Sequence, residues 1–230
     1  LLAAGYSKIF QICKCFRHGE RGSRHLPEFT LLEWYRADTD YLDLMDECEE
    51  MVGFVMEELG LPPVLEFQGK TVDLRRPWPR LTVQEAFARF ASASLEQAME
   101  SGRFDEVLSF EIEPSIGFPK PVFLYRYPSS LAALSRLSED DPGVAERFEL
   151  YAAGIELANA FSELVDPVEQ RARFERELAK RGQNGQTVYP MPEKFLHSLP
   201  FMPESAGIAL GVDRLVMLLS NQKEIDPVVS

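Results

Sequence analysis

The stretch FRHGERGSRHLPEFTLLEWY, Phe16 to Tyr35, places a polar loop between two apolar segments. The loop contains three arginines, two histidines and a glutamate, and the segment before it, KIFQICKCFR, alternates loosely. In the segment after it, a strand would put Phe29, Leu31, Glu33 and Tyr35 on one side, because strand side chains repeat every two residues. We therefore expect a hairpin whose cationic tip receives an anion; a solvated loop is the alternative.

Glu33 is the unusual residue of the second strand, because it stands between Leu32 and Trp34. Burial of a carboxylate is costly unless the carboxylate meets a partner. We expect a cationic group close to Glu33.

Composition and charge restrict the class of protein. The 230 residues are 45% hydrophobic and 27% charged, which is ordinary for a soluble globular protein and enough for a sizeable core. No apolar run approaches the roughly 18 residues that span a bilayer, so no membrane partner is expected. The net charge of −13 argues against broad nucleic-acid binding but leaves room for a local basic cleft. The chain starts with LLAAGYSKIF, which reads like a helix end before a strand, and we expect a preceding segment.

The three cysteines, Cys13, Cys15 and Cys48, are few and odd in number. Such a set is typical of reduced thiols in a cytoplasmic protein. Cys13 and Cys15 would share a strand face, and the three histidines show no zinc-ligand spacing with them. Packing is therefore favoured over a metal site for these thiols.

Periodicity and capping signals predict an α+β fold with a central antiparallel sheet flanked by helices. Helices are expected at 40–59, after the capping-box pairs Thr82/Glu85 and Ser94/Gln97, at the start of 103–117, and at 166–182. One short strand is expected at 64–69 within the connector 61–80. Further strands are expected at 121–128 and, as two strands broken near 152–154, at 145–164. Residues 205–220 predict a strand, a glycine-marked bend and a buried helix.

Acidic residues fall inside these strands: Glu149, Glu156 and Glu163 are spaced seven apart. An odd separation alternates faces in a regular strand, and a bulge or bend near Gly154 would restore a common face. A helix would also bring residues seven apart together, so the spacing leaves both structures open. Surface charge is the plain alternative, although neighbours such as Leu157 and Phe161 look buried.

Carboxylates beside a cationic loop indicate two kinds of ligand. Some would hold Mg²⁺, which takes a few carboxylates plus phosphate oxygens, and others would bind an amine. Arg17 and Arg214 would hold phosphate, because guanidinium forks match its oxygens. No serine and histidine stand in a triad-like setting. Fixed charges without a nucleophile fit attack of one substrate on another, with the protein positioning both.

Three ordered motifs carry a resemblance that extends over residues 1–230 as one catalytic domain. The FR with a nearby glutamate followed by RHLPEF, near 8–36, resembles motif 2 of class II aminoacyl-tRNA synthetases. GIALGVDRLVMLL, near 205–220, looks like their motif 3, and GIELANAFSEL resembles the lysine-binding strand of lysyl-tRNA synthetases. Motif 1 has no counterpart here and would lie before Leu1. EWYR, EPSIG, VAERFELY and ALGVDRLVML look like the lysyl-tRNA synthetase paralogues that lysylate elongation factor P.

The resemblance implies ATP- and Mg²⁺-dependent activation of lysine or β-lysine by an AMP-forming ligase, with Arg17 and Arg214 as catalytic residues. The implied ATP-binding residues are Arg17, His18, Gly19, Glu20, His25, Leu26, Phe29, Glu149, Leu150, Gly211 and Arg214. The implied substrate-binding residues are Glu33, Tyr35, Glu156, Asn159, Phe161, Glu163 and Ala209. Glu149 and Glu156 would carry Mg²⁺, while Tyr35 and Glu163 would grip the side-chain ammonium.

The chain departs from the family pattern at two loop positions. RxE is RHGE here, so Gly19 replaces the expected glutamate, and Leu26 replaces the usual asparagine. Ala209 stands where lysyl-tRNA synthetases usually have glycine and the elongation factor P ligases have alanine. The resemblance thus implies elongation factor P as acceptor rather than tRNA, and a homodimer. Two alternatives stay open: the catalytic domain of a lysyl-tRNA synthetase, and a synthetase-like protein that binds ligands without catalysis.

Overall fold

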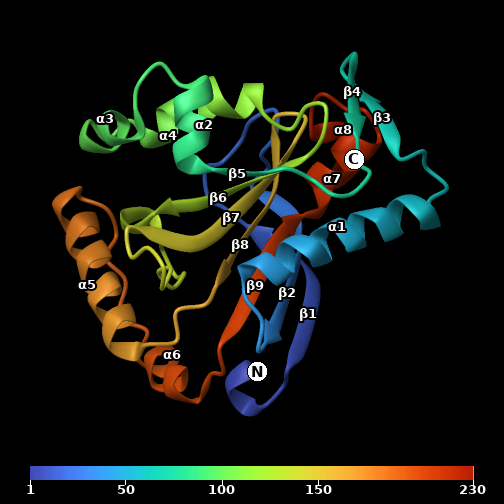
Figure 1. Ribbon diagram of the computed structural model, residues 1–230. Helices are drawn as coiled ribbons and strands as arrows, with labels where there is room; N and C mark the ends of the chain where they lie inside the picture. The colour runs from blue at the N-terminus through green and yellow to red at the C-terminus, as the bar shows by residue number, and fades with distance from the viewer. Residues whose placement is uncertain (230) are drawn as a thin grey trace.

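The computed structural model describes residues 1–229 and is organised by a seven-stranded sheet of order β1-β2-β9-β8-β7-β6-β5 (Figure 1). Its strands are β1 (Lys8–Phe16), β2 (Glu28–Ala37), β5 (Arg80–Thr82), β6 (Val122–Pro128), β7 (Val144–Ala152), β8 (Ile155–Ser162) and β9 (Ser205–Gly211). The α+β class is confirmed, and every neighbouring pair is antiparallel except β5 and β6. The long helical connection between β5 and β6 accounts for this exception, because only a crossover of a dozen or more residues joins parallel strands. The sheet is therefore mixed rather than wholly antiparallel.

Three helices begin where the capping signals predict, after Thr82, Ser94 and Asp166, whereas the helices at 193–198 and 226–229 were not predicted. The helices are α1 (Tyr41–Glu58), α2 (Val83–Phe90), α3 (Leu95–Glu100), α4 (Phe104–Val107), α5 (Pro167–Gln183), α6 (Glu193–Ser198), α7 (Val212–Leu219) and α8 (Asp226–Val229). The capping boxes of Thr82 with Glu85 and Ser94 with Gln97 are both formed. After α4 the chain continues as a π-helix, Leu108–Ile112, and a short 3-10 turn, Glu113–Ser115.

The connector 61–80 contains two strands of a separate hairpin instead of the one predicted, β3 (Val64–Phe67) and β4 (Lys70–Asp73). The second strand is short and its tip residue Gln68 has a φ of 51°. Its sequence, KTVD, contains a single apolar residue, so alternation gave no signal for this strand.

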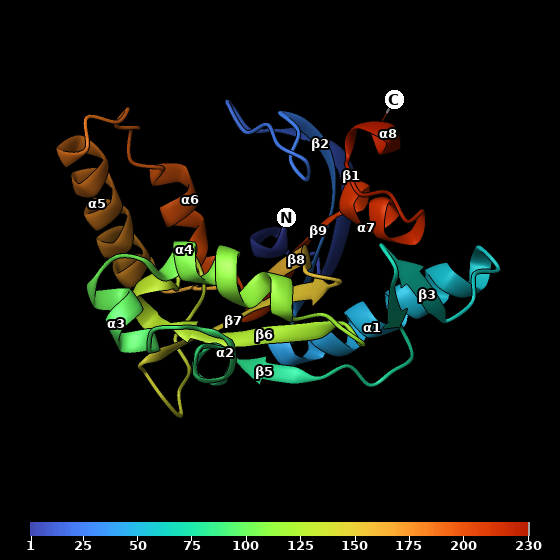
Figure 2. The same ribbon diagram turned by 90° about the horizontal axis from the view of Figure 1, so that it is seen from above.

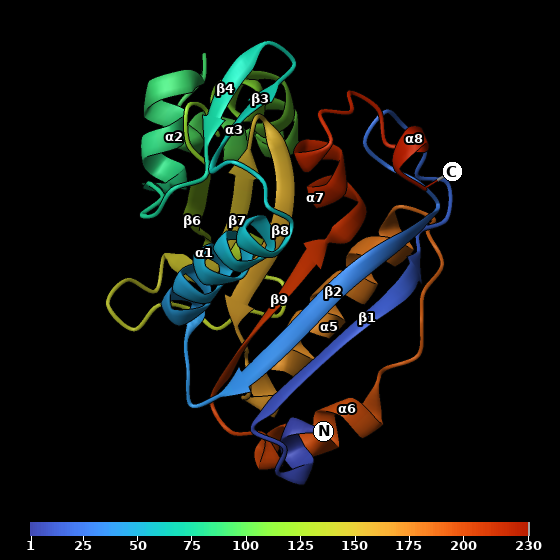
Figure 3. The same ribbon diagram turned by 90° about the vertical axis from the view of Figure 1, so that its right-hand side faces the viewer.

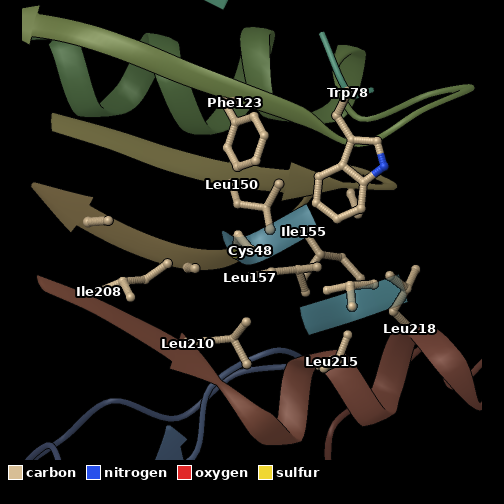
Figure 4. Close-up of a cluster of buried hydrophobic side chains, with 14 of the residues drawn as sticks. Cys48, Trp78, Phe123, Leu150, Ile155, Leu157, Ile208, Leu210, Leu215 and Leu218 are labelled. Atoms are coloured by element: carbon tan, nitrogen blue, oxygen red, sulfur yellow. The ribbon is translucent and has the colours of Figure 1, made fainter. Parts of the chain in front are cut away.

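Helices α1 and α7 cover one face of the sheet (Figure 3). The main hydrophobic core lies between them and the strands, and Leu150, Leu157 and Leu210 point into it (Figure 4). A second cluster packs α2 and α4 against β6 and β7 through residues such as Phe87, Phe104 and Tyr127. Helices α5 and α6 stand side by side at one end, away from α7 and α8 (Figure 2). No helix within residues 1–229 is long and apolar enough to cross a bilayer.

Candidate active site

A row of polar side chains runs across the sheet on the face opposite α1. Glu33 of β2 pairs with Ala209 of β9, Ala209 with Asn159 of β8, and Asn159 with Glu149 of β7. Residues directly opposite each other in antiparallel strands point to the same side. Four strands therefore present these groups side by side, although the residues are more than 170 positions apart in the chain.

The β7–β8 pair contains the irregularity that the glutamate spacing required. Leu150 pairs with Ala158, but Tyr151 pairs with Glu156, so Leu157 is an extra residue in β8. Leu157 packs into the core with Ala158. This bulge returns Glu156 to the face of Glu149, as such insertions do, and the conditional prediction of a bulge near Gly154 is confirmed.

A cavity of about 140 Å³ lies where the β1–β2 loop folds over β8 and β9. Its lining contains the predicted residues Arg17, Glu20, His25, Leu26, Phe29, Glu156, Asn159, Ala209, Gly211 and Arg214, together with Arg24, Thr30 and Asp213. The Arg17 guanidinium lies 5.2 Å from the centre of the Phe29 ring. The cavity thus joins two segments that are nearly 190 residues apart, the cationic loop and the start of α7.

Contacts to the C-terminal region hold the β1–β2 loop over this cavity. Arg21 pairs with Asp226 at 2.7 Å, and the Ile225 amide donates to the Ser23 carbonyl at 2.9 Å. The Asp213 carboxylate accepts from the Thr30 amide at 2.7 Å. These bonds hold the loop over one side of the cavity, while residues 16–23 at its tip stay exposed to solvent.

Arg214 connects three parts of the site. Its Nη1 donates to the backbone oxygen of Glu156 at 2.8 Å and to the Glu156 carboxylate at 3.0 Å. Its Nη2 lies 2.7 Å from His25 Nε2. Burial first, and then the Arg214 charge, lower the pKa of His25. His25 is therefore a neutral hydrogen-bonding group near pH 7.

Glu149 is buried behind the cavity in a dense network. Its Oε2 accepts from the hydroxyls of Tyr127 and Tyr151, each at 2.6 Å, and its Oε1 accepts from Arg147 Nη2 at 2.6 Å. Burial and then the neighbouring Glu156 charge raise the pKa of Glu149. The carboxylate is rigidly positioned, because every partner is itself held in the sheet.

Glu113 is a third acidic group at this place and was not predicted. It follows the π-helix, and the Tyr151 hydroxyl lies 3.4 Å from its carboxylate. Burial, then the charges of Glu156 and Glu149, raise the pKa of Glu113 to about 7. Such mutual repulsion among carboxylates indicates a place that favours a cation.

A second row of the sheet brings the side chains of Tyr35 and Glu163 together beside Gly207. Tyr35 pairs with Gly207 and Gly207 with Phe161. A Cβ added to Gly207 would lie 2.3 Å from the Tyr35 ring and 2.7 Å from Glu163 Oε1, so only glycine leaves room for both side chains. Burial raises the pKa of Glu163 to about 8, and no group of residues 1–229 pairs with its carboxylate. Burial and then Glu163 raise the pKa of Tyr35 to about 12, so its hydroxyl is neutral.

Glu33 does not have the cationic partner that we expected from the chain. Its Oε2 accepts from the Gln11 amide at 2.9 Å, and β2 leaves it half-buried rather than enclosed. Glu33 keeps an open side towards Ala209 and Asn159.

Of the implied ATP-binding residues, His18, Gly19, Glu149 and Leu150 do not line the cavity. His18 and Gly19 are exposed at the loop tip, and Gly19 has a φ of 79°, which favours glycine. The Leu150 side chain is fully buried in the core on the other face of the sheet (Figure 4). Leu150 therefore offers only its backbone to a ligand.

Several site residues escaped the sequence analysis. Arg147 donates through Nε to Asn159 Oδ1 at 3.1 Å and so links both rows. The alternation of Arg147, Glu149 and Tyr151 along one strand was an available signal, since all three share a face. Glu113 had no such signal, because only the packing of its segment brings it to the sheet.

Comparison with known proteins gives a family for the chain. The model of the tRNA synthetases class II (D, K and N) matches residues 1–230. The lysine–tRNA ligase of Moorella thermoacetica is 39% identical over 251 residues, which cover the whole chain and 51% of that relative. The chain thus spans about half the length of that relative.

A second group of relatives is similar to the same degree. The elongation factor P–(R)-beta-lysine ligase of Pectobacterium carotovorum is 41% identical over 238 residues, all of the chain and 73% of that relative. The protein of the same name from Salmonella gallinarum is 39% identical over 236 residues, all of the chain and 73% of that relative.

Proposed function

The chain belongs to the class II tRNA synthetases of the D, K and N type, and we propose that it activates lysine or β-lysine with ATP and transfers it to a lysine side chain of elongation factor P. The observation that carries the proposal is Glu163. This largely buried carboxylate has no partner within residues 1–229, and it lies beside Gly207 together with the ring of Tyr35, whose hydroxyl is neutral. A terminal ammonium would supply the missing charge-assisted hydrogen bonds.

The two sheet rows give such an amino acid one orientation. With its ammonium between Tyr35 and Glu163, its backbone end would extend along β8 to Asn159 and Glu33, where a carboxylate and an amide bind an amine. Its carboxylate would then reach Arg17 in the cavity under the β1–β2 loop. These roles follow the spacing of the two rows along each strand, about 6.6 Å for every two residues.

Activation is attack of the amino-acid carboxylate on the α-phosphorus of ATP. The new carboxylate–phosphorus bond forms as the bond from that phosphorus to the bridging oxygen breaks, and pyrophosphate leaves with the electron pair. Arg17 and Arg214 would hold phosphate oxygens, and Phe29 would offer a ring face to adenine. Positioning and charge stabilisation are enough for such a reaction, and no side chain has to act as nucleophile.

The acidic groups behind the cavity fit Mg²⁺. This ion is commonly held by one or two carboxylates plus substrate phosphates, and Glu149 and Glu156 share one face of the sheet. Burial and then the Glu156 charge raise the pKa of Glu149. When bound, the ion would neutralise charge on the phosphates. The chain itself contributes the rigid placement of Glu149 by Tyr127, Tyr151 and Arg147.

Two observations favour elongation factor P over tRNA as acceptor. Ala209 occupies the centre of the first row between Glu33 and Asn159, and its methyl group would favour a shifted amine such as that of β-lysine, by roughly 1–3 kcal/mol. The 230 residues also align over 238 positions with the Pectobacterium ligase but over 251 with the Moorella enzyme, so the alignment with the ligase needs fewer gap positions. The acceptor amine would attack the activated carbonyl, lose a proton and release AMP.

Charging of tRNA is the second candidate, because the identities to both groups of relatives are nearly equal. The full-length protein should be supplied with ATP, Mg²⁺ and either lysine or β-lysine, and pyrophosphate exchange measured first. Exchange that depends on the amino acid supports activation; absence of exchange would favour the non-catalytic alternative.

The acceptor is then identified by adding elongation factor P or tRNA to the same mixture. We expect mass added to elongation factor P. Efficient charging of tRNA, with elongation factor P unmodified, would overturn the first candidate in favour of the second. Ala209→Gly is the matched variant, and it should shift the preference from β-lysine towards lysine.

A further inference from the structure

A second cavity, of about 470 Å³, lies beside the one described above. Segments from five parts of the chain meet around it: the β1–β2 loop, the β3–β4 hairpin, residues 109–118, the β7–β8 turn and the loop after α7. Its charged or amide-bearing lining residues are Arg24, Gln68, Lys70, Glu113 and Lys223. None of the roles assigned so far uses the hairpin or Lys223.

The cavity is cationic in an acidic protein. Arg24, Lys70 and Lys223 line it against a single carboxylate, Glu113, while the whole chain has a net charge of −13. None of the three cations takes part in an ion pair within the part of the chain that the structure describes. Lys70 is positioned by the Phe118 ring, with Nζ 4.6 Å from the ring centre. Unpaired cations around one space favour an anion.

The walls of the cavity are held by specific bonds. The backbone amide of Gln68, at the hairpin tip, donates to Asn221 Oδ1 at 2.9 Å. The side-chain Nε2 of Gln68 donates to the backbone oxygen of Asn221 at 3.1 Å. Gln68, Asn221 and Ala153 all have φ near +50°, an uncommon backbone conformation for residues other than glycine. These contacts fix the hairpin and Lys70 against the loop that leads to Lys223.

The turn between β7 and β8 forms the opposite wall. The Ala153 amide donates to the Gly117 carbonyl at 2.9 Å, and a Cβ on Gly117 would lie 2.7 Å from that amide nitrogen. Arg24 Nη1 donates to the Gly154 carbonyl at 2.5 Å. Arg24 lines both cavities, so it connects the second cavity to the phosphate end of the first.

We propose that the second cavity binds pyrophosphate and receives it as it leaves the reacting α-phosphorus; this assignment rests on the proposed function. Three cations on three separate segments suit an anion with more than one phosphate group, because each phosphate group brings its own charged oxygens. Pyrophosphate carries the electron pair of the broken phosphorus–oxygen bond, so it is strongly anionic when it departs. Glu113, at the border with Glu149 and Glu156, would repel it and oppose its return.

The test is calorimetric titration of pyrophosphate into the full-length protein and into the double variant Lys70→Met/Lys223→Met. Both side chains are exposed and lie outside the ATP roles given above. We expect pyrophosphate to bind about tenfold more weakly, since two partly screened ion contacts are lost, while ATP affinity stays unchanged. Lys70→Arg/Lys223→Arg should retain binding, and Glu113→Gln should tighten it.

Lys194→Met is the matched control, because Lys194 is an exposed lysine of α6 without an ion pair. Unchanged pyrophosphate affinity in the Lys70/Lys223 double variant would overturn the proposal, as would an equal loss of ATP affinity. The outcome is separate from that of the proposed function. If the double variant binds pyrophosphate more weakly but the protein never catalyses lysine-dependent exchange, the site is kept and the activity is refuted. If exchange is normal but the double variant binds pyrophosphate as the wild type does, the activity is kept and the site is refuted.

Discussion

Replacement of Glu163 by glutamine tests the proposed function at its most informative residue. Glutamine preserves the shape of the side chain but cannot ionise. The loss of one charge-assisted hydrogen bond is worth roughly 1.5–3 kcal/mol, which corresponds to a ten- to hundredfold lower kcat/KM for lysine. The KM for ATP should stay the same, because Glu163 lies beyond Asn159, away from the loop that covers the first cavity.

The raised pKa of Glu163 gives a second test of its role, because it predicts a pH dependence of lysine binding. With a pKa of about 8, roughly a tenth of Glu163 is ionised at pH 7 and about half at pH 8. An ammonium binds the ionised form, so lysine affinity should rise roughly fivefold between these pH values in the wild type. Glu163→Gln should abolish this pH dependence.

Stability should change in the opposite direction from activity. The folded-state pKa of about 8 lies above the usual 4.5, so the protonated carboxyl stabilises the fold at low pH. That contribution is lost as the pH rises from about 4.5 to 8. At pH 8, Glu163→Gln should therefore be more stable than the wild type, by up to roughly 4 kcal/mol.

Three measurements check these expectations: pyrophosphate exchange against lysine concentration, the same against ATP concentration, and denaturant unfolding at pH 6 and pH 8. Glu96→Gln is the control, because Glu96 is an exposed glutamate of α3. Equal loss of lysine and ATP use, or a lysine affinity in the wild type that is flat between pH 7 and pH 8, would refute the reasoning.

Three further substitutions test other parts of the site. Gly207→Ala should remove lysine use and leave ATP binding intact, since its Cβ would meet the Tyr35 ring at 2.3 Å; retained lysine turnover would contradict the pocket. Asp213→Ala should lower the free energy of unfolding by about 1–3 kcal/mol, measured in urea, because the Thr30 amide loses a buried acceptor. Glu149→Ala should raise the Mg²⁺ concentration needed for half-maximal exchange; full adenylate formation at low Mg²⁺ would speak against a metal role.

Local sequence signals determined most of the elements. Capping boxes and hydrophobic periodicity were enough for α1, α2, α3, α5 and α7, because a helix is specified by residues three and four apart. The same holds for the β1–β2 hairpin, whose strands are adjacent in the chain. The parallel strand β5, only three residues long, gave no periodic signal, and its direction depends on the crossover that follows it.

The candidate site, like the fold, could be predicted from the sequence only in part. Its acidic and cationic residues could be chosen from the sequence, because carboxylates within apolar strands are costly and therefore conspicuous. Their arrangement could not, since side-chain facing depends on register, and one extra residue, Leu157, moves Glu156 to the other face. The pairing of Glu33 with Ala209 and the approach of Glu113 to Tyr151 exist only once distant segments pair and pack. Periodicity is a property of neighbours in the chain, whereas register, bulges and converging loops arise from contacts between residues far apart, and these only the tertiary structure decides.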